Sequence, residues 1–241
     1  MNESFLSAPM QRELGGYTLH LRQFEVARYF PQQSLAHGGM PYGLMLPEDL
    51  QRAVAKRQAE FLAGRVAACD ALQAAGVPPQ MLVVGKHRAP RWPQGVVGSI
   101  SHNANLALAV AQRIDSDVDA LLLGVDVESR IDERSLPVIQ STIATAQEAV
   151  ILARVSLNAA QRVTTLFSAK ESLFKALYPR VGQYLEFHDS RLLTWDEANG
   201  RLTLQLVQRA AELAGSAWVF EVHYLWDEQR VITLAQCHAS S

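Results

Sequence analysis

Ala120-Leu-Leu-Leu-Gly-Val-Asp-Val-Glu128 is an apolar stretch that ends in two acids, and the polar run Asp115–Asp119 precedes it. A short apolar run with such boundaries predicts a buried strand. Because side chains two residues apart on a strand point to the same face, Asp126 and Glu128 are expected to project together. The stretch therefore predicts a sheet with two carboxylates at the rim of its core.

Helices are expected after this strand and a loop that runs through Pro137. Thr145 with Glu148 forms the pattern of a capping box, which predicts a short helix. Asn158 is the expected N-cap of a longer helix, and Pro179 is its expected end. The apolar stripe of this longer helix consists of Val163, Leu166, Phe167, Phe174 and Leu177.

The part of the chain before the strand shows three patterns. The first 45 residues are expected to be irregular, because breakers such as Gly15-Gly16 interrupt them. A helical pattern runs from residue 47 to about 75. Residues 96–101 and 106–111 predict two strands, and Ser101–Asn105 has the length of a hairpin loop.

The C-terminal part of the chain is rich in strand patterns. Strands are expected over residues 185–195 and 202–207, around the turn 197–200, and over residues 218–226 and 230–236. These elements predict a mixed α+β fold with helices packed against mainly antiparallel strands.

Length and composition exclude several classes of protein. The chain has 241 residues, enough for one large domain or two small halves, and its 49% hydrophobic and 19% charged content is that of an ordinary soluble enzyme. A net charge of −2 argues against a nucleic acid as partner, so any basic site must be local.

Cysteine usage and hydropathy point to the cytoplasm. Cys69 and Cys237 lie far apart without metal-type spacing, which fits a reducing compartment and not a disulfide framework. The N-terminus lacks the features of a secretory signal, and no apolar run reaches the length of about 18 residues typical of a membrane span. We therefore expect a cytoplasmic protein that does not bind a membrane.

Three clusters of polar residues are candidates for chemistry. Asp126 and Glu128 on one rigid face suit a hard cation such as Mg²⁺, although they could also be the polar end of a strand that enters solvent. Glu171 and Lys175 share a helix face, where they would supply a third carboxylate and a positive charge for a phosphate. The alternative for them is a surface ion pair that contributes about 0.3–0.5 kcal/mol.

The third cluster is basic. Arg57 and Arg65 lie about 80° apart on the long helix and could face one groove, where arginine suits phosphate oxygens. Ser101 and His102 are expected in a tight loop, where the histidine could pair with a phosphate. Lys86, His87, Arg88 and Arg91 crowd another loop. Each group could instead be a solvated or structural feature, so the residues alone support only a possible metal and phosphate site.

Motifs in this order resemble a known family. Trp92-Pro-Gln-Gly-Val-Val-Gly-Ser-Ile-Ser-His102, Gly124-Val-Asp-Val-Glu128 and Phe167-Ser-Ala-Lys-Glu-Ser-Leu-Phe-Lys-Ala-Leu-Tyr-Pro179 resemble the three signature motifs of the 4′-phosphopantetheinyl transferases, in the bacterial siderophore-synthetase (Sfp-like) form. Lys56-Arg-Gln-Ala-Glu-Phe-Leu-Ala-Gly-Arg65 is similar to the N-terminal helix of that subgroup. The resemblance spans residues from about 47 to 180.

The resemblance implies a fold and a reaction. The fold would be a monomer of two similar α/β halves, residues 1–118 and 119–241, related by a pseudo-twofold with the cofactor cleft between them. In the implied reaction, a serine of an apo acyl carrier protein or peptidyl carrier domain attacks the β-phosphate of coenzyme A. The carrier then holds 4′-phosphopantetheine, and adenosine 3′,5′-bisphosphate leaves.

The resemblance also implies a role for each candidate residue. The residues that would hold Mg²⁺, or Mn²⁺ in its place, are Asp126, Glu128 and Glu171. Glu171, directly or through a metal-bound water, would also be the general base, and Lys175 would bind the diphosphate. The positions that would contact the phosphates and nucleotide of coenzyme A are Arg57, Arg65, Ser101, His102 and a basic residue among Lys86, His87 and Arg88.

Two other functions use the same residues. One is a different Mg²⁺-dependent phosphotransferase or nucleotide hydrolase that needs no carrier protein. The other is a non-catalytic protein that binds coenzyme A or carrier proteins, which the three metal-ready acids disfavour. The sequence leaves fatty-acid, polyketide and siderophore-peptide carriers all open as acceptors.

Overall fold

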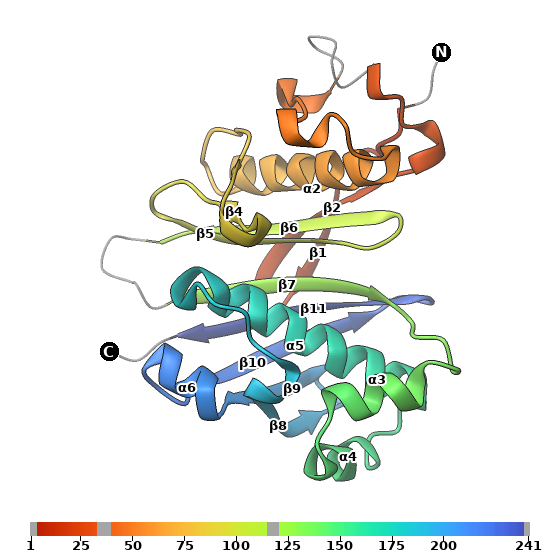
Figure 1. Cartoon of the computed structure of the whole chain (residues 1–241), viewed down its shortest axis with the longest axis vertical. Coiled ribbons are helices and arrows are strands. Elements are labelled where there is room, and N and C mark those ends of the chain that lie inside the picture. The colour runs from red at the N-terminus through yellow and green to blue at the C-terminus, as the bar shows by residue number, and fades with distance from the viewer. Residues whose placement is uncertain (1–3, 33–39, 115–120, 239–241) are drawn as a thin grey trace. The chain divides into compact units, whose positions relative to one another are not determined.

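The structure, a computed structural model, describes residues 4–32, 40–114 and 121–238 (Figure 1). The chain divides into two compact units, Met1–Asp115 and Ser116–Ser241. Each unit has an antiparallel sheet and a hydrophobic core of its own. The expected boundary, at residues 115–119, lies outside the described residues.

The first unit is a four-stranded sheet covered by one long helix, α2. Its strands run in the order β1-β2-β6-β5, and α2 packs against β2, β5 and β6. The elements are β1 (Met10–Leu14), β2 (Tyr17–Gln23), α2 (Ala55–Ala74), β3 (Val83–Val84), β4 (Pro90–Arg91), β5 (Val96–His102) and β6 (Leu106–Arg113). Short 3-10 turns lie at Val26–Arg28, Pro41–Gly43, Glu48–Leu50 and Lys86–Arg88.

Three expectations for this unit were wrong. The first 45 residues are not wholly irregular, because β1 and β2 form a hairpin. Gly15 and Gly16 between the two strands both have positive φ, as a tight hairpin turn requires. The long helix begins at Ala55, after a 3-10 turn, and not at residue 47. Ser101 and His102 are the last residues of β5 and not part of the loop.

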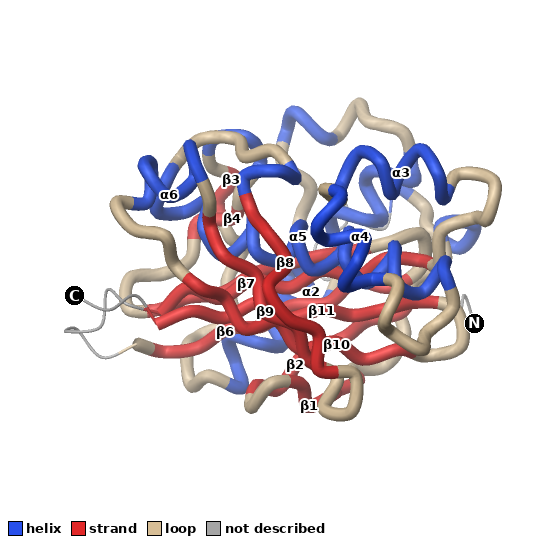
Figure 2. The backbone as a smooth tube through the Cα atoms, turned by 90° about the horizontal axis from the view of Figure 1, so that it is seen from below, coloured by secondary structure: helices blue, strands red, loops and turns tan. Residues whose placement is uncertain are grey.

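The second unit is a five-stranded sheet in the order β7-β11-β10-β9-β8, with α5 packed on β7, β11 and β10 (Figure 2). Its helices are α3 (Leu136–Ile143), α4 (Ala146–Leu152), α5 (Ala159–Val181) and α6 (Gln208–Ala214). Its strands are β7 (Leu121–Ser129), β8 (Ser190–Asp196), β9 (Arg201–Leu206), β10 (Val219–Trp226) and β11 (Arg230–His238), and a 3-10 turn covers Phe187–Asp189.

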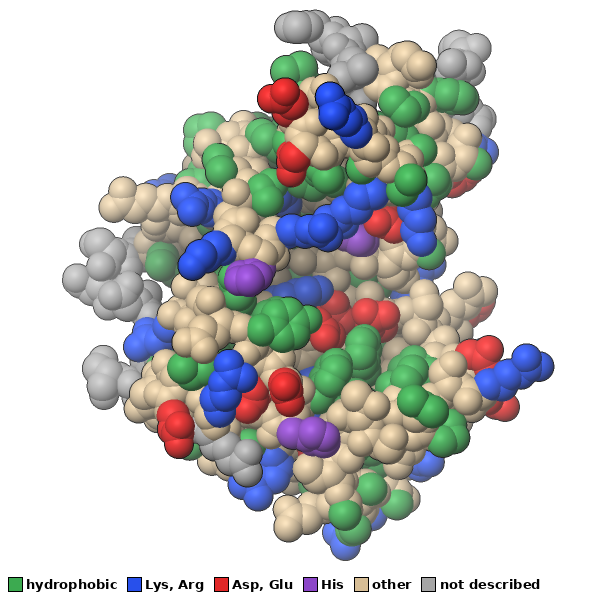
Figure 3. All heavy atoms as spheres, viewed as in Figure 1, with side chains coloured by type: hydrophobic (Ala, Val, Ile, Leu, Met, Phe, Trp, Pro, Cys, Tyr) green, Lys and Arg blue, Asp and Glu red, His purple; other side chains and the backbone are tan. Residues whose placement is uncertain are grey.

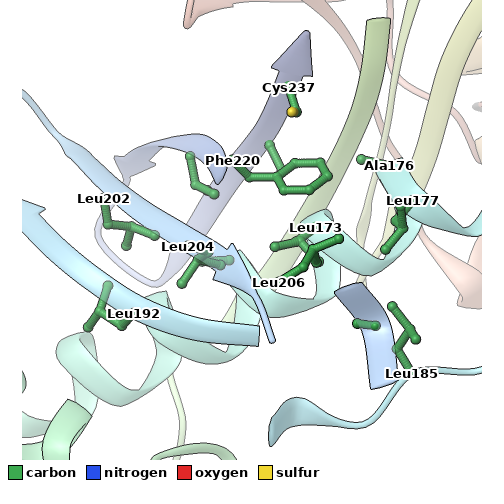
Figure 4. Packing of buried hydrophobic residues seen from close by; sticks show 14 of the residues in the cluster. Leu173, Ala176, Leu177, Leu185, Leu192, Leu202, Leu204, Leu206, Phe220 and Cys237 are labelled. Carbon is green, nitrogen blue, oxygen red and sulfur yellow. The ribbon is translucent and has the colours of Figure 1, made fainter. Parts of the chain in front are cut away.

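The core of the second unit lies between α5 and the sheet. Phe220 of β10 is fully buried there, with Leu173 and Leu177 from α5 (Figure 4). Alternate residues of β9 complete this layer: Leu202, Leu204 and Leu206. The period of two on the strands and of three to four on the helix explains why these residues meet.

The contact between β7 and α5 is exceptionally close at Gly124. A Cβ atom at this position would lie 2.0 Å from the backbone oxygen of Ser172 and 2.5 Å from the backbone nitrogen of Ala176. Only glycine allows this approach. The carboxylates that follow Gly124 on β7 are thereby held next to the middle of α5.

Most expected elements of this unit are confirmed. Capping boxes start α4 at Thr145 and α5 at Asn158. Pro179 does not end α5, which continues to Val181 and stops at Gly182 with φ +66°. Helix α3, which begins at Leu136, was expected as a loop, and β8 begins five residues later than predicted. The mixed α+β fold is confirmed.

Both cysteines are buried free thiols, one in each unit. Burial raises the pKa of Cys237, and it raises the pKa of Cys69 to about 11. Neither thiol is therefore activated as a nucleophile. Among the helices of the described residues, none is long and apolar enough to cross a membrane.

Candidate active site

A group of carboxylates lies where β7 meets α5. Asp126 is only 2% exposed, and the Nζ atom of Lys175 donates to its Oδ1 atom at 2.6 Å. Its Oδ2 atom accepts a hydrogen bond from the hydroxyl of Ser168 at 2.7 Å. Lys175 therefore pairs with a carboxylate of the neighbouring strand, which differs from the surface helix pair considered for it.

The three carboxylates influence one another electrostatically. Burial, with the negative charges of Asp126 and Glu171, raises the pKa of Glu128 to about 7 against the opposing effect of Lys175. Burial and the charge of Asp126 also raise the pKa of Glu171, again opposed by Lys175. The ammonium of Lys175 thus does not balance the negative charge of the cluster.

The chemistry of this cluster fits a hard divalent cation. All its donors are carboxylate oxygens, the ligands that Mg²⁺ prefers, and a dication would offset their excess negative charge. Among the described residues, no three His, Cys, Asp or Glu side chains already surround a metal position. A cation that took Asp126 Oδ1 as ligand would displace Lys175 from it.

Ser168 supports Asp126 and was not recognised in the sequence. It is fully buried, and its hydroxyl lies 2.9 Å from the hydroxyl of Thr233 on β11. Thr233 in turn donates to the backbone oxygen of Ser168. A helical signal existed, because Ser168 lies two turns before Lys175 on the same face of α5.

A cavity of about 490 Å³ borders the carboxylate cluster within the second unit. Glu171, Lys170 and Phe174 contribute to it from α5, and the segment 184–190 forms a second wall. Most of the surface is apolar, with Tyr184, Leu185 and Phe187 on this wall. The sequence carries no signal for this cavity, because its second wall was expected to be a strand, whereas the strand begins only at Ser190 after the 3-10 turn Phe187–Asp189.

The first unit contains a basic pocket of about 160 Å³. Four predicted residues line it, Arg57, Arg65, Arg88 and His102, and two acids, Asp49 and Glu60, are also part of the lining. Arg65 is 6% exposed, and its guanidinium carbon lies 4.6 Å from the centre of the Phe61 ring. Its Nε atom is buried and finds no hydrogen-bond acceptor among the described residues.

The electrostatics of Arg65 indicate an anion site. Burial lowers its pKa to about 10, with a further lowering from Arg57 that Cys69 opposes. A buried guanidinium with an unused donor is costly unless an acceptor reaches it. Figure 3 shows Lys and Arg side chains beside a histidine over the unit that contains α2, and acidic side chains gathered on the unit that contains α5.

Three of the predicted nucleotide contacts are not brought to this pocket. Ser101 is buried and alternates with His102 and Ile100 on β5, and those two neighbours line the pocket while Ser101 faces the other side of the strand. Lys86 and His87 are exposed and are not part of the lining, whereas Arg88 of the same loop is.

Comparison with known proteins places the chain in a family. Residues 46–112 match the family described as 4′-phosphopantetheinyl transferase N-terminal domain, and residues 122–235 match the 4′-phosphopantetheinyl transferase superfamily. Enterobactin synthase component D of Escherichia coli (strain K12) is 34% identical over 226 residues, which are 92% of this chain and 94% of that protein. The chain belongs to the 4′-phosphopantetheinyl transferase superfamily.

Two further relatives, from Streptomyces mobaraensis and Mycobacterium tuberculosis, agree with the assignment. The 4′-phosphopantetheinyl transferase Svp of Streptomyces mobaraensis is 38% identical over 69% of this chain and 68% of that protein. PptT of Mycobacterium tuberculosis is 33% identical over 66% of this chain and 70% of that protein. The holo-ACP-synthase structure from Plasmodium yoelii covers 51% of this chain and 97% of its own, with 15% identity and a TM-score of 0.38. The resemblance seen in the motifs is confirmed, and the protein is an enzyme of this class.

Proposed function

We propose that this enzyme transfers 4′-phosphopantetheine from coenzyme A to a serine of a carrier protein in a Mg²⁺-dependent reaction that releases adenosine 3′,5′-bisphosphate. The observation that carries the proposal is the carboxylate cluster of Asp126, Glu128 and Glu171 with Lys175 beside it, in a chain of this family. Phosphoryl transfer needs such a combination of metal-ready acids and a nearby cation.

The cluster would act on the reacting phosphate. Bound Mg²⁺, held by Asp126, Glu128 and Glu171, would neutralise charge on the diphosphate. Glu171 would accept the serine proton as the serine oxygen bonds to the β-phosphorus. The bond from that phosphorus to the bridging oxygen breaks, and Lys175, once released from Asp126, would stabilise the charge on the leaving group.

The basic pocket would bind the nucleotide end of coenzyme A. Arg65 would donate its unused Nε–H to a phosphate oxygen, with Arg57 and His102 on the same lining. Of the loop residues 86–88, we propose Arg88 as the nucleotide contact, because it lines the pocket.

The cavity beside Glu171 would receive the pantetheine arm. The arm is an uncharged chain with two amides, and it is attached to the phosphate on which Glu171 acts. A largely apolar cavity with a few polar groups suits such a chain. The arm would therefore lie along α5 as far as the wall formed by segment 184–190.

The acceptors we propose are apo peptidyl carrier domains and apo acyl carrier proteins, modified by a monomeric, cytoplasmic enzyme. Relatives of this chain are named as components of an enterobactin synthase, so a peptidyl carrier of siderophore assembly is the first acceptor to test. Acyl carriers of fatty-acid and polyketide synthesis are the comparison.

The decisive experiment measures the intact mass of both apo carriers after incubation with enzyme, coenzyme A and Mg²⁺. We expect a gain of one phosphopantetheine on serine that a chelator abolishes. Glu128→Ala and Glu171→Ala should lose transfer and keep their fold, whereas Glu228→Ala, an exposed acid of the same unit, should retain it. No mass gain on either carrier, or near-normal turnover by either cluster variant, would contradict the proposal.

A further inference from the structure

Lys170 precedes Glu171 directly, yet its ammonium lies in the core and is only 3% exposed. Its Nζ atom donates to three backbone oxygens, those of Ile143 at 2.8 Å, Phe187 at 2.9 Å and Ser190 at 3.0 Å. The fourth partner is Glu148, whose Oε1 atom lies 2.8 Å away. These acceptors account for all the donors of the ammonium.

Both carboxylate oxygens of Glu148 also have hydrogen-bond partners. It is fully buried, and its Oε1 atom also accepts a hydrogen bond from the backbone nitrogen of Leu192 at 2.8 Å. Its Oε2 atom accepts from the backbone nitrogen and the hydroxyl of Thr145. Burial alone would raise the pKa of Glu148, but Lys170 and these hydrogen bonds hold it below the usual value. The contacts of the two side chains therefore leave neither of them open to a further ligand.

The bonds of this pair join α5 to the wall of the cavity. Phe187 and Ser190, two of the three carbonyl partners, belong to segment 184–190 and line the cavity together with Glu171. Phe187 is the first residue of the 3-10 turn after α5, and Ser190 is the first residue of β8. Ring contact between Phe167 and Phe187, with centroids 5.3 Å apart, is a weaker tie between the same segment and α5. Such bonds stabilise the shape of a wall that has little regular secondary structure of its own.

We propose that the Lys170–Glu148 pair positions the cavity wall for the pantetheine arm of coenzyme A, and that Lys170 does not bind phosphate. This inference rests on the proposed function. While its ammonium is bound to four acceptors, Lys170 has no donor to offer a ligand. Lys170 would then occur in the motif beside Glu171 and Lys175 because it shapes the cavity, and not because its positive charge binds the ligand.

The test compares two ligands by calorimetry. Coenzyme A carries the arm, whereas adenosine 3′-phosphate 5′-diphosphate carries the same phosphates without it. In Lys170→Met, whose side chain has a similar length, we expect the affinity for coenzyme A to fall about tenfold or more, which is about 1.4 kcal/mol. The affinity for the arm-less ligand should stay within about twofold of that of the unchanged enzyme.

Each other outcome overturns the inference. Equal weakening of both ligands would make Lys170 a phosphate contact, and unchanged binding of both would show that the pair does not set the wall. Glu148→Gln should produce the same selective loss, because it leaves Lys170 buried without its counter-charge. Failure of both variants to fold, judged by circular dichroism, would make the pair a requirement of folding alone.

Two controls separate this inference from the proposed function. Arg201→Met removes two partly exposed ion pairs, with Glu221 and Asp196 in the same unit, and should leave both affinities unchanged. Binding of neither ligand by the unchanged enzyme would contradict the proposed function itself. Binding of both by the unchanged enzyme, without selective loss in Lys170→Met, would contradict only the role of the pair.

Discussion

At the scale of single residues, Arg65 shows how a buried polar group points to a ligand. Its guanidinium packs on Phe61, and its Nε–H meets no acceptor among the described residues. A buried donor without an acceptor costs about 1–3 kcal/mol of stability, so we expect a ligand to supply the acceptor. A phosphate oxygen in the adjoining pocket would supply the missing bond.

Arg65→Lys should therefore weaken binding of adenosine 3′,5′-bisphosphate by about tenfold, because lysine lacks the planar fork and the Nε–H donor. Calorimetry at constant salt measures the loss. Arg113→Lys, an exposed change on β6 outside the pocket, serves as control and should bind normally. Equal affinity of Arg65→Lys and the unchanged enzyme would contradict an anion site at Arg65.

Ser168 gives a prediction about the metal. Ser168→Ala removes the hydrogen bond to Asp126 Oδ2, so the carboxylate loses one of the contacts that orient it. Loss of such a support typically costs about 10–100-fold in metal affinity. The Mg²⁺ concentration at half-maximal transfer should rise accordingly. Ser172→Ala is a buried change on the same helix, and among the described residues its hydroxyl donates to the backbone oxygen of Ala169 and not to the cluster. This variant should leave the Mg²⁺ requirement unchanged.

At the scale of elements, the site depends on the distance between β7 and α5. Asp126 and Glu128 of β7 lie near Glu171 and Lys175 because Gly124 lets the backbone of α5 approach the strand closely. Strand β11 supports the same contact from the side through Thr233 and Ser168. The activity of the cluster and the stability of this packing are therefore linked.

Gly124→Ala should lower the free energy of unfolding by roughly 1–3 kcal/mol and reduce transfer, because its Cβ atom must push α5 away from β7. Urea unfolding and the carrier mass assay measure the two effects. The second change Ala176→Gly removes only a side-chain contact, while the closest atom is the backbone oxygen of Ser172. The double variant should therefore remain destabilised, and full recovery would contradict this account.

At the scale of the whole molecule, each unit has a buried titratable group that links its stability to pH. In the first unit, burial lowers the pKa of His20 against the opposing charges of Asp70 and Glu13. In the second, the hydrogen bonds of Glu148 and its pairing with Lys170 lower the pKa of Glu148 despite its burial. The two groups act in different pH ranges.

For His20, the unfolded chain binds a proton more readily than the folded chain, so stability should fall as the pH drops below about 6.5. Glu148 contributes stability that is fully present above about pH 4.5, the usual pKa of the group. This contribution should be lost as the pH falls through the lower pKa that Glu148 has in the folded chain. Amide hydrogen exchange in α2 and in α5 reports the two units separately. His20→Gln should flatten the pH dependence of α2 above pH 5 and leave that of α5 unchanged.

Local patterns were sufficient for much of the second unit. The capping boxes at Thr145 and Asn158, the apolar run of β7 and the shared face of Asp126 and Glu128 depend on neighbours in sequence, so they were predicted. The β1–β2 hairpin was missed although Tyr17, Leu19 and Leu21 alternate with polar residues, because Gly15-Gly16 was interpreted as a breaker and not as a hairpin turn. Only the tertiary structure decided that the polar Arg22 of β2 is buried. Its burial depends on a bidentate pair with Asp70, 48 residues away.

By itself, the sequence determined the family, the mixed α+β fold and the types of residue available for a metal and a phosphate, because motifs and periodicity are local. Only the tertiary structure decided which partners these residues meet. It paired Lys175 with Asp126, sent Lys170 into the core to meet Glu148, and turned His102 but not Ser101 toward the basic pocket. The physical reason is that ion pairs and buried hydrogen bonds join segments far apart in the chain, and no local pattern specifies those distances.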